Sequence, residues 1–202
     1  MINIDENKRQ KLDLFRKIFE EYNSHTNLMS KNDLPKIWSK HIPDSLCINL
    51  FFEKYGTPES IIDIGSGGGF PSVPMAVVYE QINVTAVDSI AKKVKFLNIA
   101  KDKLNLDNYF PVCDRIENLY KNFKNSFDVV TSRAVADLSK IIEYSCPFLK
   151  KNGFIVAYKS KNTDNELDNS KKIIEKYKLK LTDKLNYSLE NGEERCLIVF
   201  EK

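Results

Sequence analysis

The stretch that decides the fold is IIDIGSGGGFP, residues 61–71. Its first four residues are rich in β-branched side chains, which is typical of a strand buried on both faces. Four of the next five residues are glycines. Such a run predicts a tight turn whose backbone lies against a ligand, because glycine reaches positive φ angles and carries no Cβ. A helix beginning near Pro71 would then point its N-terminus at that ligand.

The spacing of the glycines separates two kinds of nucleotide-binding motif. A dinucleotide fingerprint, G-x-G-x-x-G, would need a third glycine at the position of Phe70. Gly65, Gly67 and Gly69 fit G-x-G-x-G instead. This pattern follows an acidic residue inside the strand, Asp63, and resembles motif I of the Rossmann-like S-adenosylmethionine methyltransferases.

A second acidic residue ends the next predicted strand. Asp88 closes the run 83–88, about 20 residues beyond the glycines, where this architecture uses a carboxylate to accept hydrogen bonds from the ribose hydroxyls. A glycine-rich turn that binds nothing, followed by an ordinary surface acid, is the alternative. The two features together favour a site for S-adenosylmethionine.

Length and composition limit the possibilities. The 202 residues, 42% of them hydrophobic, suit one α/β domain with a helical appendage. The net charge of +3 permits a polyanionic partner without requiring one. No apolar run approaches the ~20 residues of a membrane helix, so we expect a cytoplasmic protein that does not bind membranes. Without C-x-x-C pairs, the cysteines predict reduced, buried thiols and no metal site: Cys47, Cys113, Cys146 and Cys196.

The apolar pattern changes near residue 59. Before it, helical spacing predicts a helix at 5–24, a second helix that begins at a cap provided by Asp33, and a further helix at 44–55. After it, alternation predicts strands at 60–64, 83–88, 109–113, 127–132 and 154–159, separated by helices at 71–79, 91–103, 138–149 and 165–177. Gly153 would end the helix at 138–149. The turn at 190–193, between strands at 179–189 and 195–200, predicts a closing hairpin.

These elements predict an α/β fold of the Rossmann-like class I methyltransferase type. We expect a mostly parallel seven-stranded sheet with helices on both faces. An N-terminal helical extension would span 1–58 and a single compact methyltransferase domain would span 59–202. Because ligands of such sheets bind at the carboxyl ends of the strands, the residues at those ends are the site candidates.

The strand ends also carry a resemblance to a known family. Its most specific pieces are GSGGGFP at 65–71, DS at 88–89 followed by KKVKFL at 92–97, and TSRA at 131–134, with IWSKHIPDSL at 37–46 upstream. In this order they resemble the bacterial small-subunit ribosomal RNA methyltransferase G family, also called glucose-inhibited division protein B. The chain departs from the family pattern at Lys93, where arginine is common, and at Ser160, where glycine is usual.

The resemblance implies methyl transfer from S-adenosylmethionine to N7 of one guanine in 16S ribosomal RNA, free or in a small-subunit particle. It places cofactor contacts at Gly65, Phe70, Ile116, Glu117 and Arg133. The chemistry of the turn and the ribose adds Gly67, Gly69 and Asp88. Arg133 would position the reacting groups without a general base, and we expect a monomer.

Arg133 and His41 each allow a second interpretation. Arg133 could pair with a carboxylate such as Asp63 or Glu117. His41 lies near Trp38 in a predicted helix, where a histidine is more typical of packing or capping, so its role stays open.

Basic residues near the strand ends are the candidates for RNA contact: Lys92, Lys93, Lys159 and Arg195. A lysine run is more often a solvated helix face, which is the alternative for the first two. Competing functions are a methyltransferase for another RNA, a small molecule or a protein, and a non-enzymatic RNA-binding assembly factor. A nucleotide-dependent oxidoreductase is disfavoured by Phe70 at the third glycine position.

Overall fold

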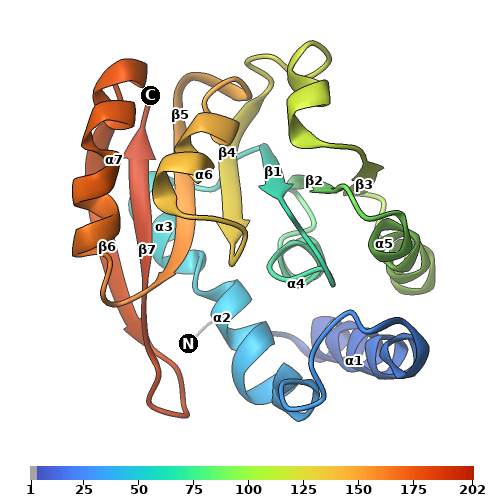
Figure 1. Cartoon of the computed structure of the whole chain (residues 1–202). Helices are drawn as coiled ribbons and strands as arrows, with labels where there is room; N and C mark the ends of the chain where they lie inside the picture. Colours follow the sequence, from blue (N-terminus) through green and yellow to red (C-terminus); the bar gives the residue numbers. More distant parts are fainter. Residues whose placement is uncertain (1–3) are drawn as a thin grey trace.

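The computed structural model describes residues 4–202, so residues 1–3 of the expected N-terminal extension lie outside the described residues. One seven-stranded sheet has the order β3-β2-β1-β4-β5-β7-β6 (Figure 1). Strands β1 to β5 pair in parallel, whereas β7 runs antiparallel to both β5 and β6. The predicted mostly parallel sheet and closing hairpin are confirmed. The strands are β1 (Ser60–Ile64), β2 (Asn83–Asp88), β3 (Tyr109–Cys113), β4 (Phe127–Arg133), β5 (Leu149–Ser160), β6 (Lys180–Ser188) and β7 (Glu194–Glu201).

Helices cover both faces of the sheet, and each face has its own apolar core. One core contains side chains of α1 (Glu6–Thr26), α4 (Ser72–Val78) and α5 (Ala91–Leu104). The opposite core contains side chains of η3 (Ile116–Tyr120), α6 (Leu138–Ser145) and α7 (Asp164–Tyr177). Strands buried on both faces explain the continuous β-branched run at the start of the glycine stretch.

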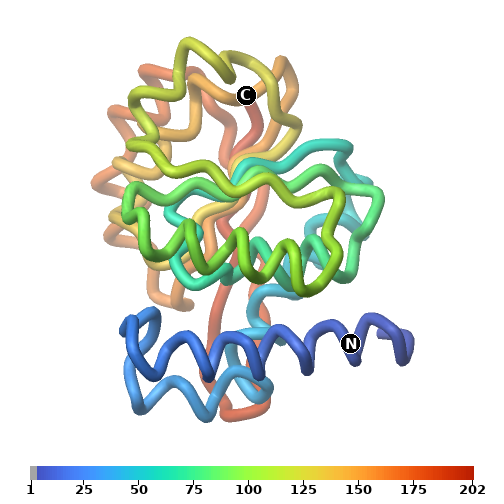
Figure 2. Tube along the Cα trace, turned by 90° about the vertical axis from the view of Figure 1, so that its right-hand side faces the viewer, coloured from blue at the N-terminus to red at the C-terminus, as the bar shows by residue number. Residues whose placement is uncertain are grey.

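Helix α1 packs along the edge of the first layer, next to α4 and α5 (Figure 2). It begins where the Asp5 carboxylate accepts a hydrogen bond from Lys8 N at 2.9 Å, and it ends at Asn27, whose φ is 53°. The apolar stripe is fully buried at Leu12, Phe15 and Phe19. The predicted amphipathic helix is therefore confirmed, and it extends two residues further than predicted.

The segment after α1 is not the pair of regular helices that the sequence predicts, one capped by Asp33 and one at 44–55. It winds through η1 (Leu34–Lys36), η2 (Ile37–His41), α2 (Ile42–Leu46) and α3 (Asn49–Tyr55). Asp33 caps none of them, since its carboxylate accepts a hydrogen bond from Ser30 Oγ at 2.8 Å. The proline at position 43 has no amide hydrogen to continue a regular helix, so the chain changes helical type before it.

The predicted end of the helix at 138–149 is also wrong. Helix α6 ends at Ser145, and Pro147 prevents its continuation. Gly153 lies inside β5, where a Cβ would sit 3.0 Å from the carbonyl oxygen of Asp128 on β4. The glycine therefore allows two strands to approach closely and does not cap a helix.

The cysteines and helices test two further expectations. All four thiols are free, and Cys146 and Cys196 are buried as predicted, whereas Cys47 is only half-buried. Cys113 is exposed at the end of the edge strand β3, so the prediction of burial is wrong for that residue. Within residues 4–202, no helix combines the length and the apolar character required to cross a bilayer.

An aromatic cluster joins α1 to the glycine turn. The Phe70 ring lies 5.2 Å from Phe15 and 5.5 Å from Phe19, measured between ring centroids. Phe96 of α5 lies 5.2 Å from Phe19. Gly68 fits against this cluster only because it has no side chain, since a Cβ there would lie 2.6 Å from Phe19 Cε2.

We expect Gly68→Ala to destabilise the protein by roughly 1 to 3 kcal/mol, because the added methyl group would push a fully buried ring out of its packed position. Urea unfolding followed by circular dichroism measures the change. The double variant with Phe19→Leu should lose less stability than the sum of the two single variants, because leucine leaves room for the methyl group. Unfolding of Gly68→Ala at the wild-type urea concentration would contradict this packing.

Candidate cofactor site and the Arg133 cluster

Backbone hydrogen bonds fix the glycine turn against β2. Gly65 N and Ser66 N both donate to the carbonyl oxygen of Val87, at 2.8 and 2.9 Å. Gly67 N donates to Asp88 Oδ2 at 2.9 Å. The turn needs glycine because φ is 71° at Gly65 and 56° at Gly67, values that L-residues rarely adopt.

The glycines serve different purposes within the turn. A Cβ at Gly65 would lie 2.5 Å from Val135, and a Cβ at Gly69 would lie 2.7 Å from Val73, so these two permit protein packing. The nearest atom to a Cβ at Gly67 would be 3.8 Å away. Gly67 does not line the cavity described next, but it is the glycine of this turn whose surroundings leave the most space for an approaching ligand.

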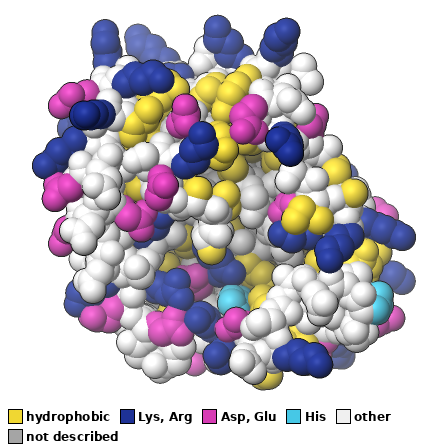
Figure 3. Space-filling model, in the orientation of Figure 1, with side chains coloured by type: hydrophobic (Ala, Val, Ile, Leu, Met, Phe, Trp, Pro, Cys, Tyr) yellow, Lys and Arg dark blue, Asp and Glu magenta, His cyan; other side chains and the backbone are white. Residues whose placement is uncertain are grey.

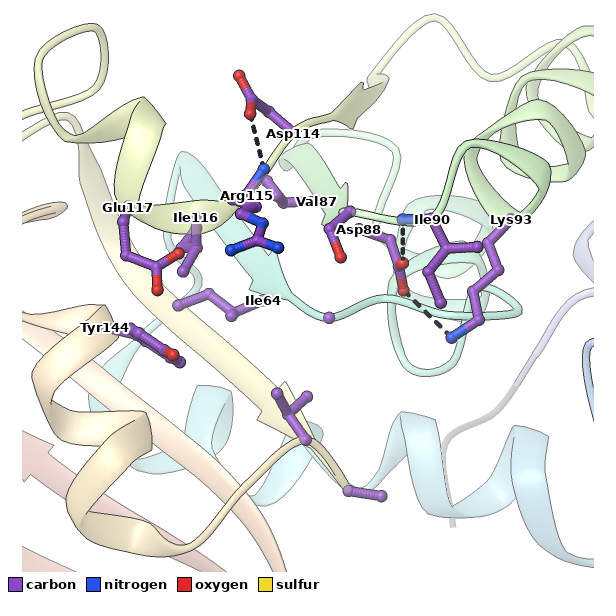
Figure 4. Close-up of a pocket in the computed structure, with 14 residues that line it drawn as sticks. Ile64, Val87, Asp88, Ile90, Lys93, Asp114, Arg115, Ile116, Glu117 and Tyr144 are labelled. Carbon is purple, nitrogen blue, oxygen red and sulfur yellow. Dashed lines mark hydrogen bonds and ion pairs between the residues drawn. The ribbon is translucent and has the colours of Figure 1, made fainter.

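A cavity of about 430 Å³ opens beside this turn, at the carboxyl ends of β1 to β4 (Figure 4). This volume is within the range of small-molecule sites. Four of the predicted cofactor residues line it: Gly65, Asp88, Ile116 and Glu117. The remaining lining residues are Ile64, Val87, Ser89, Ile90, Lys93, Asp114, Arg115, Ala134, Val135 and Tyr144.

The walls of the cavity suit a nucleoside. Ile64, Val87 and Ile116 provide an apolar surface for a flat base, and carboxylates at the rim accept hydrogen bonds from hydroxyl and amino groups. Asp88 is already ordered for this task, because Oδ1 accepts a hydrogen bond from Ile90 N at 2.9 Å. Lys93 Nζ lies 3.6 Å from Asp88 Oδ2.

Several lining residues go beyond those that the sequence indicates. Tyr144 reaches the cavity from α6, on the side of Glu117, as Figure 4 shows. Ile90, Arg115 and Val135 lie within two positions of predicted residues in the chain, so proximity to a strand end could have indicated them. No local signal marks Tyr144, because it lies within a helix whose pattern is only amphipathic.

Asp63 is buried below the glycine turn with one oxygen unpaired. Oδ1 accepts a hydrogen bond from Thr131 Oγ1 at 2.8 Å, whereas Oδ2 has no partner among residues 4–202. Burial raises the pKa of the Asp63 carboxyl from 3.8 to about 6, and the Thr131 hydrogen bond opposes that shift. A buried acceptor of this kind fits a ligand that carries an ammonium group.

Arg133 lies on the other side of the turn, outside the residues that line the cavity. Its Nη1 donates to Asp44 Oδ2 at 2.8 Å, and the guanidinium carbon lies 5.4 Å from the centroid of the Phe70 ring. The carboxylate partner is therefore Asp44 of α2, and the suggested partners Asp63 and Glu117 are both wrong. Neither of them is bonded to Arg133 because the guanidinium points toward the N-terminal helices.

His41 belongs to the same cluster. Its Nδ1 lies 3.2 Å from Arg133 Nη2, and its ring centroid lies 5.4 Å from that of Phe70. Burial, together with the Arg133 cation, lowers the pKa of His41 from 6.5 to about 4. The imidazole is therefore neutral at pH 7. Since arginine can only donate, Nδ1 accepts and the proton resides on Nε2.

The four basic residues predicted to contact RNA all have partners within the protein. Lys92 Nζ donates to the carbonyl oxygen of Thr26 at 3.0 Å, and Lys93 faces Asp88. Lys159 pairs with Glu166 at 2.6 Å, and Arg195 pairs with Glu193 at 2.5 Å. Figure 3 shows basic and acidic side chains intermixed over one face of the molecule, with apolar side chains in its central hollow.

The sheet order and the site together define a Rossmann-like methyltransferase fold. Solved structures with low sequence identity share it. An O-methyltransferase from Bacillus cereus in complex with SAH superposes with a TM-score of 0.62 at 13% identity, covering 100% of this chain and 93% of the other. The TYW2 protein of M. jannaschii in complex with AdoMet gives 0.62 at 19% identity, covering 82% and 76%.

Sequence relatives define the particular family. Residues 8–195 match the family described as rRNA small subunit methyltransferase G. A protein of that name from Lactococcus lactis subsp. lactis (strain IL1403) is 34% identical over 100% of this chain and 85% of its own length. Another from Staphylococcus aureus (strain JH9) is 35% identical, with 100% and 84% covered. The chain belongs to the rRNA small subunit methyltransferase G family, whose members are S-adenosylmethionine-dependent enzymes.

The buried carboxyl of Asp63 predicts an unusual dependence of stability on pH. Its pKa is about 6 in the folded protein and near 3.8 in the unfolded chain. The folded state therefore holds this proton more tightly, and stability decreases as pH rises from about 4 to above 6. Asp63→Asn does not titrate, so the variant should gain roughly 2 to 3 kcal/mol relative to wild type between pH 4 and pH 7.5.

Urea unfolding of both proteins at the two pH values measures this difference. The amide changes stability directly by the same amount at both pH values. This contribution therefore cancels when the stability difference between variant and wild type at pH 7.5 is compared with that at pH 4. A gap between variant and wild type that does not change with pH would contradict the raised pKa of Asp63.

Proposed function

We propose that the protein methylates N7 of one guanine in 16S ribosomal RNA, using S-adenosylmethionine. The observation that supports this most directly is a nucleoside-sized cavity at the carboxyl ends of β1 to β4 in a chain of the rRNA small subunit methyltransferase G family. The substrate would be the free RNA or a small-subunit particle. The division into an extension at 1–58 and a methyltransferase domain at 59–202, a monomeric state and a cytoplasmic location remain predictions.

Gly65, Gly67, Asp88, Ile116 and Glu117 would hold the cofactor directly. The sulfonium of bound S-adenosylmethionine supplies an activated methyl group. Asp88 would accept hydrogen bonds from the ribose, and the open backbone at Gly67 would allow close approach. Two more predicted contacts, Gly69 and Phe70, pack against Val73 and the α1 aromatic rings, so they support the shape of the turn.

The chemistry of the acceptor follows from the end of β4. The segment TSRA at 131–134 lacks the Asn or Asp followed by Pro-Pro and an aromatic residue that exocyclic amine methyltransferases carry there. Pyrimidine carbon-5 methylation needs a cysteine nucleophile. The Cys-Pro step at 146–147 is placed after α6, and its thiol is buried in the core. N7 of guanine has an exposed lone pair and needs no proton removed.

Positioning would then supply most of the rate enhancement. Holding two reactants in line can contribute roughly 7 to 11 kcal/mol. Arg133 is the residue we assign to this task, since its guanidinium is fixed next to the glycine turn. His41, with a pKa of about 4, is a poor proton acceptor at neutral pH. Lys92, Lys93, Lys159 and Arg195 would contribute to phosphate binding.

We expect Asp88→Ala to weaken S-adenosylmethionine binding by ~1.5 to 3 kcal/mol, because it removes a charged hydrogen-bond acceptor. Gly67→Asp should weaken binding further, because a side chain would enter the open space beside the turn. Calorimetric titration measures both. The control is Asp128→Ala, since Asp128 holds Ser60 N at the opposite end of the sheet, at 2.9 Å. Unchanged affinity in both site variants would contradict the assignment of the cofactor to this cavity.

Arg133→Ala should lower the rate of methyl transfer far more than His41→Ala, because the guanidinium positions the reactants and the neutral imidazole transfers no proton. Single-turnover assays with ribosomal RNA and radiolabelled S-adenosylmethionine compare the two rates. Nuclease digestion and mass analysis of the product should give 7-methylguanosine. A methyl group on an exocyclic amine, a pyrimidine or a ribose would refute the proposed reaction, and RNA binding without turnover would identify an assembly factor instead.

A further inference from the structure

We propose that Asp44 and Tyr187 are positioning residues for methyl transfer, acting through Arg133. Asp44 belongs to the N-terminal helices and Tyr187 to the C-terminal hairpin, so two segments outside the cofactor cavity would control the geometry of the reaction. This inference rests on the proposed function of Arg133 as the residue that orients the reacting groups.

The first step is the ion pair between Arg133 and Asp44. The nitrogen–oxygen distance is 2.8 Å, and only 13% of the arginine side chain and 4% of the aspartate side chain are exposed. A charge pair this well shielded holds its geometry, because removing either partner leaves the other buried without compensation. The side chain of Arg133 is therefore fixed by a residue 89 positions away in the sequence.

The second step is the contact that fixes Asp44 itself. Tyr187 Oη donates to Asp44 Oδ1 at 2.6 Å, so the two carboxylate oxygens bind two different strands, β4 through Arg133 and β6 through Tyr187. Burial and the Asp44 charge raise the pKa of Tyr187 well above its ordinary value, which keeps its hydroxyl protonated and donating. Without this bond, the contact with Arg133 alone would set the orientation of the carboxylate.

The third step is how completely the guanidinium is surrounded. Besides Asp44, it contacts His41 Nδ1 through Nη2 at 3.2 Å and lies over the Phe70 ring. The contacts come from three separate segments: α2, η2 and the residue after the glycine turn. Since a misplacement of about 1 Å at a reaction centre can lower a rate roughly 100-fold, the supports of Arg133 should matter to catalysis.

A purely structural role is the alternative, because the same contacts hold the helices and the hairpin to the sheet. The two roles predict different effects of the Tyr187 hydroxyl on the rate when Arg133 is absent. If Tyr187 acts through Asp44 on the guanidinium, the effect of removing its hydroxyl on the rate must disappear when Arg133 is absent. If the hydroxyl only stabilises the fold, the effect on the rate remains the same in both backgrounds.

The experiment uses the full chain and compares Tyr187→Phe with Tyr79→Phe. Both changes delete one tyrosine hydroxyl that donates to a side-chain oxygen, and Tyr79 Oη bonds Asn49 Oδ1 at 3.1 Å, away from the cluster. We expect Tyr187→Phe to lower kcat roughly 10-fold with little change in KM for S-adenosylmethionine, and Tyr79→Phe to leave both unchanged. Asp44→Asn should lower kcat roughly 100-fold, because it also removes the charge opposite Arg133.

The decisive measurement places Tyr187→Phe in the Arg133→Ala background, with saturating ligands and single-turnover detection. No further loss of rate supports the inference. An equal loss in both backgrounds, or a wild-type kcat for Tyr187→Phe, overturns it. A wild-type rate for Arg133→Ala would overturn the role of Arg133 itself, whereas a slow Arg133→Ala with normal Asp44→Asn and Tyr187→Phe would overturn only the positioning role. Thermal unfolding of each variant confirms that it is folded at the assay temperature.

Discussion

The hydrogen bonds from the glycine turn to β2 are the constraint on which the rest of the site depends. Three consecutive backbone N–H groups, from Gly65 to Gly67, donate to Val87 and Asp88. They fix the turn in a geometry in which φ is positive at Gly65 and Gly67. The same bonds orient Asp88, so the loop that would meet the cofactor and the carboxylate that would meet its ribose form one rigid unit.

The residue after the turn connects this unit to the rest of the molecule. The Phe70 ring contacts Phe15 and Phe19 of α1 on one side and His41 and Arg133 on the other. The N-terminal helices therefore contribute His41 and Asp44 to the Arg133 cluster, although none of their residues lines the cavity. Because Phe70 stands where a dinucleotide fingerprint would have glycine, the same position that excludes one cofactor class supplies the anchor for the extension.

Local chemistry determines how much of the site can be predicted from the sequence. Gly65, Asp88 and Glu117, which lie at or shortly after the ends of β1, β2 and β3, are predictable, because apolar runs locate strands and a parallel sheet brings their carboxyl ends together. The partner of Arg133 is not. Several carboxylates are equally plausible, and the choice of Asp44 depends on how short irregular helices pack, which no periodicity encodes. Gly153 misleads for a similar reason, since glycine after an apolar helical run fits both a helix end and a close approach of two strands.

The basic residues show the same limit and suggest how RNA could engage the surface. An exposed ion pair contributes only about 0 to 1 kcal/mol, so a phosphate can displace a carboxylate from such a pair at little cost. The ion pair of Arg195 with Glu193 could exchange in this way, since a quarter of the arginine side chain is exposed. The ion pair of Lys159 is harder to exchange, because only 11% of its side chain is exposed and it binds both Glu166 and the Ala136 carbonyl. Phosphate affinity should therefore come mainly from exchange at the more exposed pairs, and Lys159, which also holds β5 against α7, should contribute least of the four predicted residues.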